Sequence, residues 1–181
     1  MLEKKFVFIH QPDFLPWKGF FKKLKKSQLF VVLDDVKFNR RGWTNRDKIL
    51  INSKPTWITI PVQKKGNYNE IIKNIKIDYK NNWTNKLFKI LEHNYKKAPC
   101  FDFHYEFIKK IISDDHEYLI DLNMKLIKYV MDYFNIENET IFSSNLHIKE
   151  KKGFKILEIL KRTNATNYIT GIGSNRWREP R

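Results

Sequence analysis

The chain has 181 residues, of which 41% are hydrophobic and 15% aromatic, and it carries a formal net charge of +15 at pH 7. This length and composition predict one packed domain, or one domain with a small lobe, and exclude an intrinsically disordered protein. The single cysteine, Cys100, excludes an internal disulfide, and no apolar run is long enough for a signal-peptide core or a membrane span. We therefore expect a cytoplasmic protein.

The positive charge is spread along the whole chain. Lysines occur singly or in pairs, and asparagine and isoleucine are also abundant. This spacing is typical of a solvated surface rather than of a nucleic-acid interface. Contacts with polyanions or with an anionic membrane remain alternatives. A basic protein also suits an acidic small-molecule substrate, such as a nucleotide-linked sugar.

Residues 5–33 have the pattern of a strand–helix–strand unit. Residues 5–9 are a short apolar run that predicts a buried strand, and residues 29–33 predict a second one. Between them, Pro16 suits the first turn of a helix, where its missing N–H costs nothing. Two strands joined through a helix imply a parallel pair. The apolar stripe at helical spacing is Trp17, Phe20, Phe21 and Leu24.

The next segment mixes polar loops with short apolar runs. Residues 39–48 are polar and predict irregular structure. Residues 57–62 predict a third strand, which ends at Pro61 or lies at a sheet edge because proline cannot donate to a ladder. Residues 71–77 predict a further strand.

From residue 82 the pattern becomes helical. A second helix is predicted over 101–112, and Asp114 with Glu117 resembles a capping box that opens a third. The remaining elements are a strand over 140–143, a helix over 153–161 and a strand over 167–170.

These elements predict an α/β fold. A βαβ-containing, mostly parallel sheet lies in a sheet-rich half over residues 1–80, and a helical half follows over residues 81–165. In such sheets ligands bind beyond the carboxyl ends of the strands, so polar residues that follow the strands are the first candidates for a site.

Three candidate catalytic residues follow the first two predicted strands. His10 ends the first strand, and histidine titrates near neutrality, so it suits a general base or a phosphate contact. Asp34 and Asp35 end the second strand and suit a sugar hydroxyl, a magnesium ion or an amine. Adjacent residues of an extended chain point to opposite faces, so we expect one of the two to face the site. The alternatives are a strand cap for His10 and a turn cap for the other aspartate.

The polar segment after the second strand is the candidate anion clamp. Arg40, Arg41, Arg46 and Lys48 lie close together in sequence, with Asn45 among them. Guanidinium groups bind phosphate or carboxylate with two parallel hydrogen bonds, so this segment suits a diphosphate. The alternative is a solvated basic loop.

A glycine turn follows the last predicted strand. The backbone N–H groups around Gly171 and Gly173 could wrap a phosphate, although this spacing also fits a plain turn. Cys100 shows no nearby base and suits a structural role. The histidines have no metal-ligand spacing, so we predict no metal site, and no cofactor follows from the sequence.

Several of these segments together resemble the WbqC-like protein family, and the resemblance spans nearly the whole chain. Gln11 and Trp17 lie in its most specific motif, so they join the candidate substrate-binding residues. The motifs that carry it are His10-Gln11-Pro12, Leu15-Pro16-Trp17, Gly19-Phe20-Phe21, Leu33-Asp34-Asp35-Val36, Asn45-Arg46, Trp57-Ile58-Thr59-Ile60-Pro61-Val62, Asn94-Tyr95, Ala98-Pro99, Leu122-Asn123, Ser143-Ser144 and Tyr168-Ile169-Thr170-Gly171.

The resemblance implies a bacterial enzyme of surface-polysaccharide or lipopolysaccharide O-antigen synthesis. Some members are described as glycine transferases, so the implied reaction moves an acyl or aminoacyl group onto a nucleotide-linked amino sugar. Family members usually continue for several dozen residues beyond the glycine turn, so we expect this chain to lack that segment. Three alternatives remain: a nucleotidyl or adenylyl transferase similar to the HIGH-type enzymes, an inactive remnant, and a basic binding module.

Overall fold

The computed structural model describes residues 4–63 and 69–171, and the chain forms two compact units. Unit 1 contains Met1–Gln11, Pro16–Asp35 and Met131–Arg181. It therefore combines described segments from early and late in the sequence, and most of the remaining residues are inserted between them.

Unit 2 contains Pro12–Leu15 and Val36–Val130. The chain leaves unit 1 once after β1 and once more after β2, so most of unit 2 is one long insertion. The expected single domain, with a sheet-rich half over 1–80 and a helical half over 81–165, stays a prediction.

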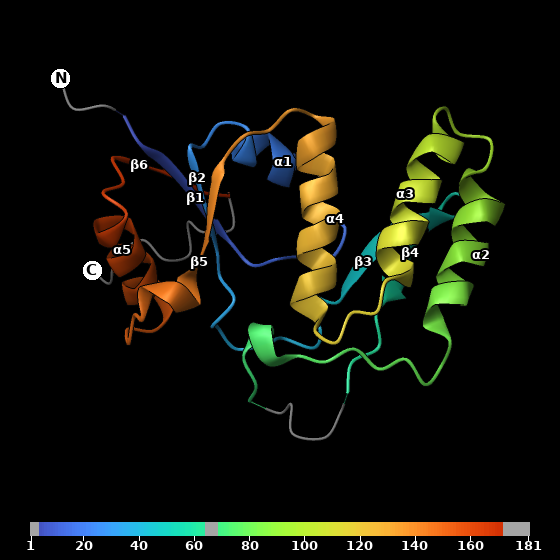
Figure 1. Cartoon of the computed structure of the whole chain (residues 1–181), viewed down its shortest axis with the longest axis horizontal. Coiled ribbons are helices and arrows are strands. Elements are labelled where there is room, and N and C mark those ends of the chain that lie inside the picture. The colour runs from blue at the N-terminus through green and yellow to red at the C-terminus, as the bar shows by residue number, and fades with distance from the viewer. Residues whose placement is uncertain (1–3, 64–68, 172–181) are drawn as a thin grey trace. The chain divides into compact units, whose positions relative to one another are not determined.

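Unit 1 is built on a four-stranded sheet (Figure 1). The strand order is β5-β2-β1-β6, and all three neighbouring pairs are parallel. This confirms the α/β class and the parallel pair expected for the first two strands. Each residue of β2 is buried, which is typical of a parallel strand covered on both faces. The strands are β1 (Phe6–His10), β2 (Leu29–Val32), β5 (Glu139–Phe142) and β6 (Asn167–Ile169).

Helices cover the two opposite faces of this sheet. Successive residues of a strand point to opposite faces, so β1 contributes to two cores. On one face Phe8 packs edge-on against Phe20 of α1, with ring centroids 5.2 Å apart. On the other face Val7 belongs to a buried cluster that includes Ile159 of α5. Unit 1 is therefore a three-layer α/β/α arrangement. The two helices are α1 (Lys18–Leu24) and α5 (Lys152–Arg162).

The apolar stripe expected along α1 is only partly buried. Phe20 and Leu24 are buried as expected. Trp17 is 67% exposed, because it precedes the first helical residue and its extended backbone turns it away from the core. The stripe therefore begins one turn later than the spacing predicts.

Unit 2 begins with an antiparallel hairpin of β3 (Arg46–Ile51) and β4 (Lys54–Thr59). Its turn is formed by Asn52 and Ser53, whose φ angles of 49° and 61° are both positive, as two-residue hairpin turns of this class require. The expected irregular segment over 39–48 is therefore wrong from Arg46 onward. Three consecutive charged residues, Arg46, Asp47 and Lys48, obscure the strand pattern at the start of β3.

The strand expected over 71–77 is also wrong. The chain forms a short 3-10 turn, Ile72–Asn74, flanked by isolated bridges. Ile72, Ile75 and Ile77 are all buried, because the irregular backbone brings them to the same side. Apolar spacing alone does not separate this from a strand.

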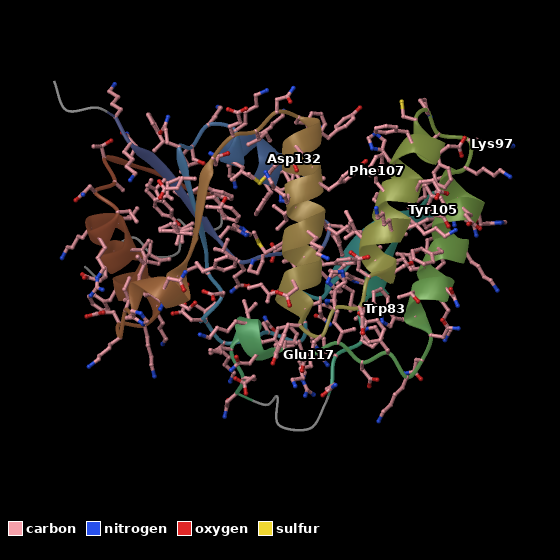
Figure 2. The ribbon with its side chains drawn as sticks, in the orientation of Figure 1. Trp83, Lys97, Tyr105, Phe107, Glu117 and Asp132 are labelled. Carbon is pink, nitrogen blue, oxygen red and sulfur yellow. The ribbon has the colours of Figure 1, made fainter. Side chains whose placement is uncertain are left out.

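Two helices of unit 2 are joined by a tyrosine–glutamate contact. The Tyr105 hydroxyl donates a hydrogen bond to Glu92 Oε1, and Tyr105 lies between α2 and α3 (Figure 2). Burial and the nearby carboxylate raise the pKa of Tyr105 well above its usual range.

Within the described residues, no helix has the length and apolar character needed to cross a membrane. The helices are α2 (Trp83–Tyr95), α3 (Phe101–Ser113) and α4 (Leu119–Tyr133).

The capping box expected at Asp114 and Glu117 does not form. The Asp114 carboxylate pairs with Lys125 Nζ at 2.9 Å, and Glu117 pairs with Lys76 Nζ at 2.5 Å. Both carboxylates are thus engaged with lysines rather than with the backbone N–H groups of α4. Lys76 is distant in sequence, so this competition could not be predicted locally.

Candidate functional site

The carboxyl ends of the parallel strands define the candidate site in unit 1. Numbered along the chain within the sheet, the strands lie in the order 3-2-1-4, so the direction of winding reverses between β1 and β6. In open α/β sheets a ligand binds beyond the carboxyl ends at this reversal. The residues there are His10 and Gln11 after β1, and Thr170 and Gly171 after β6.

Asp34 connects the carboxyl ends of β2 and β5. The Asp34 N–H donates to Val32 O at 3.0 Å, a tight turn that ends the extended backbone of β2. The Asp34 carboxylate, 3% exposed, accepts bonds from Ser144 N at 2.9 Å, Ser144 Oγ at 2.6 Å and Ser143 Oγ at 3.1 Å. Asp34 therefore caps the 3-10 turn Ser143–Leu146, the alternative role considered for one of the two aspartates.

Asp35 turns toward the same serine and toward a buried lysine. Its carboxylate accepts bonds from Ser143 Oγ and from Lys155 Nζ, the latter at 2.7 Å. Burial alone would raise the pKa of Asp35, but the hydrogen bonds from Lys155 and Ser143 and the charge of Lys155 outweigh it and lower the pKa. The carboxylate is thus ionised at neutral pH. The turn at Asp34 explains why both aspartates face Ser143, contrary to the strict alternation expected.

His10 lies on the α1 face of the sheet. Its ring stacks on Phe8 with centroids 5.5 Å apart and meets Phe20 edge-on at 5.3 Å. His10 Nδ1 lies 3.0 Å from Gln11 O, an acceptor, so Nδ1 carries a proton. In the neutral ring Nε2 is then the unprotonated nitrogen that a general base uses. The geometry is compatible with the catalytic role predicted for His10.

The other predicted residues of unit 1 flank this edge. Trp17 precedes α1, and Gly171 follows Thr170 after β6. Gln11 is half-buried and supplies the carbonyl that holds the His10 ring. Gly173 lies outside the described residues.

The predicted anion clamp belongs to unit 2. Arg40 and Arg41 are exposed, and the Arg46 guanidinium donates to Arg41 O while lying 4.2 Å from the Trp57 ring centroid. Lys48 Nζ lies 5.0 Å from the same ring. The outer hairpin face thus carries cations against an aromatic side chain. Its convergence with His10 and the aspartates of unit 1 stays a prediction.

Asn45 is buried and bonded to the backbone of Ile60. It is 4% exposed, and its Nδ2 donates to Ile60 O at 3.1 Å while Ile60 N donates back to Asn45 O at 2.8 Å. This pair of bonds ties the start of β3 to the residue that follows β4. Asn45 Oδ1 is buried without a hydrogen-bond partner among the described residues, and the substrate-binding role of Asn45 stays a prediction.

Three polar residues of the network had no role in the sequence-based prediction. Ser143 ends the strand predicted over 140–143 and Ser144 follows it, so the rule that carboxyl ends of parallel strands meet at one edge could have identified them. The sequence does not mark Lys155 as a site residue, because a single lysine in a helix is normally expected at the surface. In the structure Lys155 is only 5% exposed. Within the described residues, no group of three or more His, Cys, Asp or Glu side chains could hold a metal ion.

The comparison with known proteins decides the family. Residues 11–181 match the model of the WbqC-like protein family. The chain belongs to this family. A relative from Mycobacterium tuberculosis, described as uncharacterized protein Rv1507c, is 28% identical over 178 residues, which cover 98% of this chain and 77% of that protein. No solved structure matches the chain. The family match includes Asp34, Asp35 and their partners, and it begins directly after His10.

Proposed function

We propose that this WbqC-like protein is a transferase that binds a nucleotide-linked sugar at the carboxyl edge of the unit 1 sheet. The reaction moves an acyl or aminoacyl group, such as glycyl, onto an amino group of that sugar. The observation that supports it is the reversal of strand order between β1 and β6, with His10 and Gly171 at the two strand ends.

His10 is the residue best suited to move the proton. When an amine attacks an acyl carbonyl, the new C–N bond forms, the nitrogen loses a proton and the donor's leaving group departs. His10 with Nδ1 protonated presents Nε2 as the acceptor for that proton. Ionised Asp35 accepts hydrogen bonds from the Ser143 hydroxyl and from Lys155, and we expect its carboxylate to orient a hydroxyl or ammonium group of the acceptor.

The second candidate is nucleotidyl or adenylyl transfer from ATP. The histidine that ends β1, the helix that follows it and the parallel strand β2 resemble the start of the HIGH-type enzymes. This likeness concerns the fold alone. The two candidates differ in which nucleotide occupies the site.

Isothermal titration calorimetry separates them. We expect saturable binding of UDP-N-acetylglucosamine, whose acetylated nitrogen makes it an analogue of the N-acylated product, and weaker binding of ATP. The reverse order would favour nucleotidyl transfer. Absence of binding for both ligands would contradict nucleotide recognition.

The role of His10 is tested in the same preparation. Replacing His10 with alanine removes the proton acceptor, so group transfer should fall by about 100-fold or more, while binding of the nucleotide sugar is largely kept. Product is measured by mass spectrometry of the sugar nucleotide. A purified His10→Ala protein with full transfer activity would show that another group accepts the proton.

A further inference from the structure

Two glycines of unit 1 make room for the side chains of Trp17, which precedes α1, and of Lys23 within it. A Cβ atom added to Gly19 would lie 2.0–2.5 Å from ring atoms of Trp17, so the indole packs directly on the helix backbone. Most of the ring nevertheless remains accessible, since Trp17 is 67% exposed. Trp17 is therefore a fixed but open aromatic surface.

The second glycine accommodates Lys23. A Cβ atom added to Gly171 would lie 2.8 Å from Lys23 Nζ. The ammonium thus lies against the backbone just beyond β6, at the reversal of strand order. It is also 5.9 Å from the ring centroid of Trp17, the residue that directly precedes α1.

Within residues 4–63 and 69–171, the Lys23 ammonium lies over the Trp17 ring but is not neutralised by a carboxylate. No carboxylate of these segments pairs with it, although Lys23 is half-buried. A cation beside a strand end, partly removed from water and uncompensated by the surrounding described residues, is suited to an anion. Exposed lysines elsewhere on α1 lack this setting.

We propose that Trp17 and Lys23 form the nucleotide subsite of unit 1, in which the indole stacks on the base and the ammonium pairs with the phosphate. The inference rests on the proposed function and identifies the residues that would recognise its nucleotide. Every base offers a flat face for stacking on an aromatic ring, and phosphate pairs readily with lysine. In a 5′-nucleotide only one ribose separates base and first phosphate, a span comparable with the 5.9 Å between the two groups.

Calorimetric titrations of ligands with and without phosphate test this subsite. UDP-N-acetylglucosamine and ATP carry phosphate, whereas uridine and adenosine do not. Lys23→Ala should weaken the two phosphate ligands by about tenfold or more and leave the nucleosides within about twofold. Lys22→Ala is the matched control, because Lys22 is exposed on the same helix and should change no affinity.

Two further variants separate a loss of ligand binding from a loss of folding, because each should weaken a different set of ligands. Trp17→Ala should weaken nucleotides and nucleosides alike, by about tenfold. Gly171→Ala keeps the charge of Lys23 but displaces its flexible end, so it should weaken only the phosphate ligands. Circular dichroism confirms that each variant is folded.

The outcomes distinguish this inference from the proposed function. If the wild type binds nucleotides and Lys23→Ala behaves like Lys22→Ala, the subsite is wrong and nucleotide recognition stands. If Trp17→Ala leaves all affinities unchanged, the stacking role is wrong. If the wild type binds neither nucleotide, both the subsite and the proposed function are overturned.

Discussion

Lys155 and Asp35 form a buried ion pair at the site. Their side chains are 7% and 17% exposed, and Lys155 Nζ lies 2.7 Å from Asp35 Oδ2. Lys155→Ala leaves the Asp35 charge without its main partner, so the free energy of unfolding should fall by about 3–5 kcal/mol. Urea denaturation followed by circular dichroism measures the loss.

A double variant and a surface control complete this test. Lys155→Met combined with Asp35→Asn removes both charges and should recover much of the loss, because neither charge then remains buried. Lys161→Ala, on the exposed part of α5, should change stability by less than about 0.5 kcal/mol. Equal effects of Lys155→Ala and Lys161→Ala would contradict the burial of the pair.

The lowered pKa of Asp35 predicts an acid-sensitive contribution to stability. A carboxyl group with a pKa below its ordinary value of 3.8 stabilises the fold above that value and loses the contribution as the pH falls through the folded-state pKa. The difference in unfolding free energy between wild type and Asp35→Asn should therefore be constant from pH 7 to about pH 5 and shrink below about pH 4. Urea titrations at each pH measure it. A difference that widens in acid would contradict the shift.

The candidate site could be predicted from the sequence only in part. His10, Asp34 and Asp35 were identifiable because polar residues that end apolar strands meet at one sheet edge. Their partners were harder to identify, since Lys155 comes from a distant helix and its burial depends on tertiary packing. The alternation rule failed at Asp35, because a tight turn had already ended the strand.

At the scale of elements, Asn123 holds the segment between β1 and α1 in unit 2. Asn123 is fully buried, and its Nδ2 donates to Pro12 O and Thr44 O, both at 2.7 Å. Asn123→Ala leaves two carbonyls without this donor and should cost about 2–4 kcal/mol. The free energy of unfolding measures it, with the exposed Asn85→Ala as control. A cost equal to that of the control would contradict the tether.

The elements that the sequence predicted well are those whose burial is simple. The continuous apolar runs correctly predicted β1 and β2, and the apolar stripes at helical spacing correctly predicted α2, α3 and α5. The hairpin strand β3 was missed because its first residues are charged and resemble a polar loop. The 3-10 turn Ile72–Asn74 was missed because its buried isoleucines have the spacing of a strand. The boundaries of a helix or strand depend on local polar contacts, whereas its type depends on the overall apolar pattern.

At the scale of the whole molecule, the net charge of +15 raises the question of nucleic-acid binding. We attribute the charge mainly to solvated surface, so a fluorescent single-stranded oligonucleotide should show no measurable binding at about 150 mM salt. Fluorescence anisotropy across a salt series measures it. Tight binding that persists at this salt, with a steep dependence of log affinity on log salt, would favour the basic binding module.

The central claim is that the carboxyl edge of the unit 1 sheet binds a nucleotide between the ends of β1 and β6. A crystal structure of the protein with UDP-N-acetylglucosamine tests this most directly. We predict that the diphosphate lies within hydrogen-bond distance of Lys23 Nζ, with the base against Trp17 and the sugar near His10. A ligand bound elsewhere, with no contact to the ends of β1 and β6, would contradict the account.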